Sequence, residues 1–64
     1  MTINCIRERT LILEKMWQEH HNKKVCNILL QQLTNDIVFF LGEKLPEDLE
    51  QRLDQLDEEI HNDN

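Results

Sequence analysis

Apolar residues recur at helical spacing along most of the chain, and short polar stretches divide them into three runs. The first run predicts a helix over residues 3–20, because its apolar positions fall on one side while charged residues occupy the other. A helix of this kind buries its apolar side against another element of the fold. The apolar side consists of Ile3, Ile6, Ile12, Leu13, Met16 and Trp17.

The second run predicts a helix over residues 23–41. Its apolar members are Val25, Cys26, Ile28, Leu29, Leu30, Leu33, Ile37, Phe40 and Leu41. Residues 37–41 are apolar on every side and fit a buried strand when read alone, but they continue the helical pattern up to Gly42. A helix that is apolar all round is normally covered all round. We therefore expect two chains to pair through the face from Cys26 to Leu41, as a homodimeric helix bundle.

A polar segment at positions 18–24 separates the first two runs and leaves two structures open. Asn22 suits the N-cap of a new helix, which would make an antiparallel helical hairpin with a short turn. Alternatively, one helix continues through the segment, since Glu19 and Lys23 form a favourable pair four residues apart. Such a helix over residues 3–41 would be about 57 Å long and would need a second chain for its core. We favour the hairpin, because the polar residues interrupt the apolar side.

Gly42 and Pro46 are the only glycine and the only proline, and they mark the end of the second helix and the start of a third. Glycine suits the left-handed position just beyond a helix, and proline suits the first turn, where its missing N–H costs nothing. We predict a turn at 42–45, a third helix over residues 46–60 and a frayed tail at 61–64. The third helix has a narrow apolar stripe, which docks by one edge or pairs in a coiled coil. This stripe consists of Leu45, Leu49, Leu53, Leu56 and Ile60.

The formal net charge is −6, and nine of the 13 acidic residues lie in residues 42–64. The predicted third helix is therefore an acidic arm, formed by Glu47, Asp48, Glu50, Asp54, Asp57, Glu58 and Glu59. Such an arm repels phosphate backbones, and it either keeps the protein soluble or steers it toward a basic partner surface. On a surface that normally holds nucleic acid, it would act as an inhibitor by charge mimicry.

The length of 64 residues allows one small domain, residues 1–64, and domains of this size usually need a disulfide, a metal or a second chain. Two cysteines, Cys5 and Cys26, are too few for a secreted disulfide scaffold. Charged residues begin at Arg7, and no run approaches the roughly 20 apolar residues of a membrane span. We expect no signal peptide, no membrane segment and a cytoplasmic location.

Metal-binding side chains are few and poorly spaced. In the hairpin, Cys5 and Cys26 begin successive helices on the order of 20 Å apart, and only His20, His21 and Cys26 approach one another around the turn. Paired ligands such as Cys-x2-Cys are absent from the sequence, so we expect no metal and no cofactor. The chain has no serine and no glycine-rich phosphate loop, so we expect no enzymatic activity.

The segment Leu30-Gln31-Gln32-Leu33-Thr34 is similar to the Ser-Gln-x-x-Asp motif of the small helical-hairpin phosphatases that remove aspartyl phosphate from response regulators. The resemblance covers only these few residues. Gln31 is kept, whereas Leu30 replaces the serine and Thr34 replaces the aspartate. It implies, as an alternative function, a phosphatase-like regulator of a response regulator in which Gln31 orients the attacking water.

Nucleic-acid binding by a dimeric helical hairpin is the other alternative. Its candidates are Arg7, Arg9, Lys15, Lys23 and Lys24. Acidic residues lie among them, and a pI near 4.8 opposes the basic footprint of such proteins. We therefore predict a non-enzymatic regulatory protein that binds another protein, as an inhibitor or modulator.

Large apolar side chains are the candidate contacts with a partner or a second chain. Trp17 is a natural interface anchor, since tryptophan is enriched at binding hot spots. Phe39 and Phe40 differ by about 100° around the helix, so one of them is expected to meet a second chain. The full set of predicted contacts is Trp17, Cys26, Leu29, Leu30, Leu33, Ile37, Phe39, Phe40 and Leu41.

Overall fold

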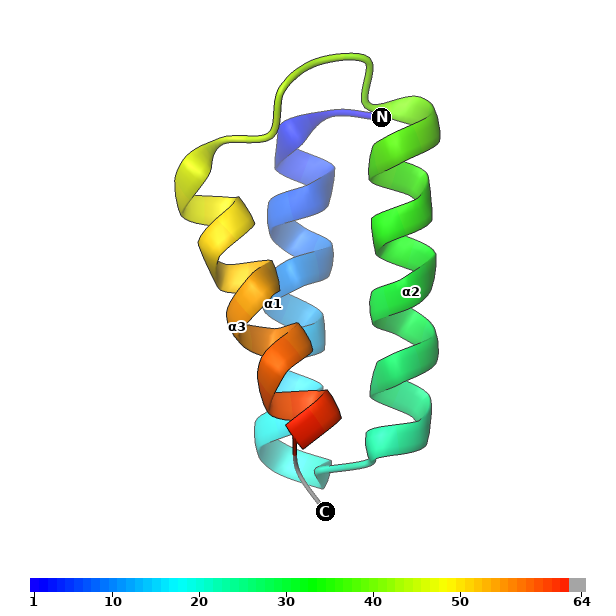
Figure 1. Cartoon of the computed structure of the whole chain (residues 1–64), viewed down its shortest axis with the longest axis vertical. Coiled ribbons are helices and arrows are strands. Elements are labelled where there is room, and N and C mark those ends of the chain that lie inside the picture. The colour runs from blue at the N-terminus through cyan, green and yellow to red at the C-terminus, as the bar shows by residue number, and fades with distance from the viewer. Residues whose placement is uncertain (63–64) are drawn as a thin grey trace.

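The computed structural model describes residues 1–62, which form three helices and no strand. Helix α1 spans Ile3–His20, α2 spans Lys23–Phe40 and α3 spans Glu47–Asn62. The prediction of an all-α fold is confirmed. Figure 1 shows α1 and α2 running antiparallel and joined by a short turn at one end, and α3 packs against both of them.

The turn between α1 and α2 decides between the two structures that the polar segment left open. His21 ends α1 in the left-handed conformation, with φ 51°, and its backbone N–H donates to the carbonyl of Trp17 at 3.0 Å. The imidazole stacks on the indole of Trp17, with the ring centroids 4.1 Å apart. Asn22 then caps α2, because its side-chain oxygen accepts a hydrogen bond from the N–H of Val25 at 3.2 Å. The chain therefore reverses here instead of continuing as one helix.

The connection from α2 to α3 uses the glycine and the proline as the sequence suggests. Gly42 adopts φ 72° just beyond the end of α2, in the left-handed region that glycine enters without strain. The carbonyl of Pro46 accepts the N–H of Glu50 at 3.0 Å, so the first helical hydrogen bond of α3 starts at the proline.

The observed helix bounds differ from the predicted ones by one or two residues. Helix α2 ends at Phe40, one residue before the predicted end, and α3 begins at Glu47, one residue after the predicted start. Helix α3 continues to Asn62, so residues 61 and 62 are helical where we predicted a frayed tail. The rest of that predicted tail, residues 63–64, lies outside the described residues.

The core forms where each helix turns one apolar face toward the other two. Its buried side chains are Ile6, Leu13, Trp17, Cys26, Leu30, Leu33, Leu41, Leu49, Leu53, Leu56 and Ile60. Thr10 is also fully buried, and its hydroxyl donates to the carbonyl of Ile6 at 2.7 Å, so this buried hydroxyl has a hydrogen-bond partner. The narrow stripe of α3 thus docks by one edge onto the hairpin of its own chain, the first of the two arrangements we predicted for it.

All three arginines of the chain form ion pairs between helices. Arg7 of α1 donates to Asp48 of α3 at 2.8 Å, and Arg9 of α1 donates to Asp36 of α2 at 2.8 Å. Arg52 of α3 donates through two nitrogens to the carboxylate of Glu14 on α1. These pairs are partly exposed, so each contributes modestly to stability but fixes how the helices face one another.

Candidate protein-binding surface

The structure corrects the expectation that a second chain covers the face of α2 from Cys26 to Leu41. Within residues 1–62, α1 and α3 of the same chain cover that face. Five of the predicted contacts are core residues, namely Trp17, Cys26, Leu30, Leu33 and Leu41. Leu29 and Ile37 are half-buried, and only Phe39 and Phe40 remain exposed. A partner that binds the folded chain therefore cannot use most of the predicted contact set.

The exposed apolar side chains of α2 lie near its two ends. Val38, Phe39 and Phe40 are consecutive and are 71%, 75% and 66% exposed. At the other end of α2, Val25 and Ile28 are 40% and 55% exposed. We call these five residues the α2 apolar surface. Single exposed apolar residues are ordinary, but a run of three on one helix end is typical of a contact surface.

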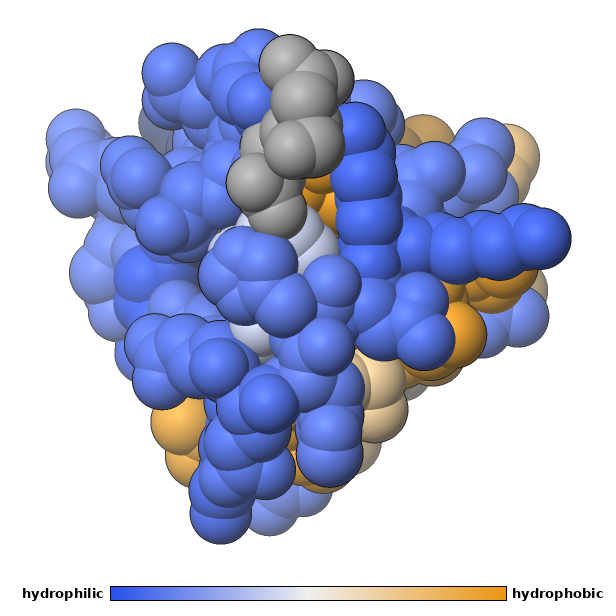
Figure 2. Space-filling model, turned by 90° about the horizontal axis from the view of Figure 1, so that it is seen from below, coloured by the Kyte–Doolittle hydropathy of each residue, from blue (hydrophilic) through white to orange (hydrophobic). Residues whose placement is uncertain are grey.

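Four residues of α2 line the side of the helix that faces away from the core. Ile28, Gln32, Asn35 and Phe39 follow one another at spacings of four, three and four, so they lie within about 60° around the helix. We call this set the α2 stripe. All four are exposed, and none is charged. Figure 2, the view from below, shows apolar side chains emerging on the right and lower right, the side on which α2 lies in Figure 1.

The apolar surface continues from α2 onto α1. A shallow groove of about 130 Å³ runs between these helices and is lined by Arg9, Ile12, Leu13, Leu29 and Leu33. Ile12 is 60% exposed at its edge, and the ion pair between Arg9 and Asp36 closes over the same side of the hairpin. The apolar area therefore extends from α2 to Ile12 of α1, where the exposed charged residues Lys15 and Glu19 border it.

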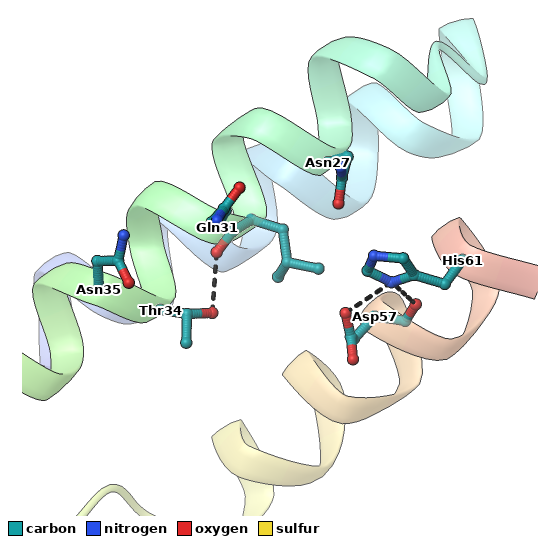
Figure 3. Close-up of a pocket in the computed structure, with 7 residues that line it drawn as sticks. Asn27, Gln31, Thr34, Asn35, Asp57 and His61 are labelled. Carbon is teal, nitrogen blue, oxygen red and sulfur yellow. Dashed lines mark hydrogen bonds and ion pairs between the residues drawn. The ribbon is translucent and has the colours of Figure 1, made fainter.

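A second groove, of about 320 Å³, lies between α2 and α3, and most of the residues that line it are polar (Figure 3). Gln31, the residue that the phosphatase resemblance singles out, lies in it on α2, across from Asp57 and His61 on α3. Nδ1 of His61 lies 2.8 Å from both the backbone oxygen and a carboxylate oxygen of Asp57. Thr34 stands where those phosphatases have aspartate, and its hydroxyl donates to the carbonyl of Leu30 at 2.9 Å. The carboxylate nearest to Gln31 in this groove thus comes from α3, outside the motif.

The predicted acidic arm is the solvent side of α3. Its seven residues are all exposed, and Glu47, Asp48 and Glu50 lie in the first turn, where the positive end of the helix dipole favours negative charge. The hydrogen bond from Arg7 holds the pKa of the Asp48 carboxyl below its ordinary value. The hydrogen bond to Glu14 raises the pKa of Arg52 above its ordinary value. The Asp48 carboxylate therefore stays charged at neutral pH, and all seven acidic residues of the arm face water.

The cysteine and histidine side chains do not assemble into a site. Within residues 1–62 no three side chains of the metal-binding types come together, so His20, His21 and Cys26 form no ligand set. Cys5 is an exposed free thiol, whereas Cys26 is buried, and burial raises the pKa of its thiol. None of the helices in this part of the chain is both long and apolar enough to cross a membrane.

Sequence reasoning missed Val25, Ile28 and Val38 as surface residues. The signal was present, because Ile28 lies four positions before Gln32 and seven before Asn35, on the polar side of α2. Apolar residues that share one side of a helix with polar residues are the apolar residues that stay exposed to solvent.

No family model, curated protein or solved structure matches the chain.

Proposed function

We propose that this protein is a small non-enzymatic regulator that acts by binding another protein, as an inhibitor or modulator, through the α2 apolar surface. The observation that carries the proposal is the exposed run of Val38, Phe39 and Phe40. The three side chains add nothing to the core, because the core closes without them. Aromatic residues, phenylalanine among them, are also enriched at protein interfaces relative to the rest of the surface.

The charge distribution supports a protein partner over nucleic acid. Arg7, Arg9 and Arg52 are already paired with carboxylates between the helices, which leaves them poorly placed to bind phosphates. The acidic side of α3 lies outside the α2 apolar surface and steers the protein toward a partner with a basic rim. A homodimer, expected from the sequence, belongs to the same proposal, because the α2 apolar surface is also open to a second copy.

Site-specific photo-crosslinking tests the proposal. A benzophenone amino acid replaces Phe39 in one version of the chain and Leu11 in a matched version, since Leu11 is 59% exposed on α1 but lies outside the α2 apolar surface. In extract of the source cells, we expect the probe at position 39 to capture a protein of different sequence that the probe at position 11 does not capture. That protein is then purified, and its affinity is measured directly.

The affinity measurement decides the outcome. We expect the double substitution Phe39→Asp/Phe40→Asp to weaken binding of the purified partner at least tenfold, and Leu11→Asp to leave it within twofold. Equal affinity for all three chains refutes the α2 apolar surface as the binding site. Salt separates the two contributions, because steering by α3 predicts slower association at high ionic strength, whereas an apolar contact changes little.

A further inference from the structure

The α2 stripe has a spacing that reads the same in both directions. From Ile28 the steps to Gln32, Asn35 and Phe39 are four, three and four residues. A twofold axis at the level of the peptide between Leu33 and Thr34 therefore places the four stripe residues of a second, antiparallel copy at the same four levels. This self-match is the property that an isologous interface between two identical chains requires.

An antiparallel second copy satisfies every position of the stripe at once. Ile28 of each chain lies opposite Phe39 of the other, which pairs apolar with aromatic at both ends. Gln32 of each chain lies opposite Asn35 of the other at the centre. Both side chains are amides that donate and accept hydrogen bonds, so the two central pairs need no water and no charge.

The flank of the stripe that faces α1 fits the same arrangement. Phe40 lies on this flank, because it follows Asp36 by four residues and Asp36 binds Arg9 of α1. Val25 and Leu29 lie on the same flank near the other end of α2. The twofold axis keeps like flanks together, and it brings Phe40 to a level between Val25 and Leu29 of the second copy. The most exposed aromatic residues thus meet apolar residues in both chains.

Charge favours the antiparallel orientation over a parallel one. The antiparallel orientation places Lys24 of each chain near the carboxyl end of α2 of the second copy, which is the negative end of that helix dipole. A parallel pair would place Lys24 beside Lys24. It would also align the two α2 dipoles in the same direction.

The exposed area suits a dimer of ordinary size. Phe39 and Phe40 are 75% and 66% exposed, which corresponds to about 280 Å² for side chains of about 200 Å² each. A standard interface covers about 800 Å² per partner, and these two residues supply about a third of it. Val25, Ile28 and the exposed edge of Ile12 extend the same side of the molecule.

We infer that a second copy of this chain covers the α2 stripe in the antiparallel register, so that self-association and binding of another protein compete for one surface. This inference rests on the proposed function of the α2 apolar surface and adds its regulation. It differs from the homodimer expected from the sequence, which used the face of α2 that α1 and α3 now cover.

Sedimentation equilibrium over a hundredfold range of concentration tests self-association. We expect the wild-type chain to move from 7.8 kDa toward twice that mass as concentration rises. Ile28→Asp and Phe39→Asp should shift the midpoint at least tenfold upward, and Leu11→Asp should shift it less than twofold. Circular dichroism checks that each variant keeps its helices. A wild type that stays monomeric throughout, or variants that dimerise like the wild type, overturns the inference.

Disulfide capture tests the register. In a Cys5→Ser background, chains carrying Ile28→Cys are oxidised alone, chains carrying Phe39→Cys are oxidised alone, and the two are oxidised as a mixture. Only the mixture should form a covalent dimer, because like positions in the antiparallel pair are about 16 Å apart along the helix and a disulfide spans at most about 7 Å between Cα atoms. Efficient bridges in either chain alone indicate a parallel pair and overturn the register.

Competition separates failure of this inference from failure of the proposed function. If both hold, the covalent dimer of the Ile28→Cys and Phe39→Cys chains should not bind the purified partner, and reduction of its disulfide should restore binding. If the wild type stays monomeric and the Phe39→Asp substitution abolishes binding of the partner, self-pairing is overturned and the proposed function stands. If the wild type dimerises but the partner binds the Phe39→Asp chain as tightly as the wild type, the proposed function and the competition are both overturned.

Discussion

Replacing Leu49 by alanine tests whether α3 is part of the fold or a loosely attached acidic arm. Leu49 is 0% exposed at the start of α3, where its side chain enters the core between the hairpin helices. Removing a fully buried leucine side chain costs about 2–5 kcal/mol. A chain of this length has about 3–10 kcal/mol of total stability, so the substitution should remove about a fifth of it or more. At about 3 kcal/mol, Tm falls by about 20 °C.

Urea unfolding measures the change with two independent signals. Far-ultraviolet circular dichroism follows all helices, and the fluorescence of Trp17 follows the contact with α3. Trp17 lines a hollow together with Arg52 and Leu56, so its emission reports whether α3 is docked. In the wild type we expect both signals to change at the same urea concentration, because the three helices share one core.

Leu11→Ala is the matched control, since Leu11 is 59% exposed and should tolerate the same truncation within about 0.5 kcal/mol. A cost below about 1 kcal/mol for Leu49→Ala would refute the docked position of α3. So would a tryptophan signal that does not respond to the substitution. Either result would mean that the acidic helix is tethered to the hairpin without completing its core.

Three further outcomes follow from individual contacts. Because Arg7 lowers the pKa of Asp48 from an ordinary value of 3.8, the stability from this pair is complete above that pH and is lost as pH falls through the lower folded pKa. Asp48→Asn should therefore flatten the pH dependence of the urea midpoint below about pH 4. With a thiol reagent, Cys5 should react at once and Cys26 only in denaturant, and mass spectrometry should show one adduct and then two. His21→Val should cost about 1–3 kcal/mol in urea, because a β-branched residue is strained at φ 51°.

Local signals in the sequence predicted the helix ends well. Gly42, Pro46 and Asn22 each act through the few residues beside them, by a left-handed backbone, a missing N–H or a capping side chain. The stripe of α3 was also readable, because all of its apolar residues lie on one side of the helix. The turn at His21 was harder to predict, since the left-handed position beyond a helix is usually filled by glycine or asparagine.

The buried face of α2 was not predictable from its pattern alone. Leu30 and Leu33 lie in the core, and Ile28 and Phe39 lie in solvent, yet all four are large apolar residues of one helix. The polar neighbours Gln32 and Asn35 mark the side of Ile28 and Phe39, but the sequence does not show that α1 and α3 of the same chain cover the opposite side, since that depends on contacts far apart in the sequence. The chain was also expected to be too short to cover α2, whereas the edge of α3 proved wide enough to close the core.

The stability of the chain and its assembly can be separated at Phe39. The side chain is 75% exposed, so in a single chain Phe39→Asp removes little buried area and should cost less than about 0.5 kcal/mol. In a dimer, folding and association are linked, and each tenfold rise in concentration stabilises the dimer by about 1.4 kcal/mol. The wild-type Tm should therefore rise with concentration, the Phe39→Asp Tm should stay constant, and the two should coincide on dilution. A Phe39→Asp chain that is clearly less stable than the wild type at the lowest concentration would show that Phe39 stabilises the single chain. Phe39 would then not be available as the main contact residue of the α2 apolar surface.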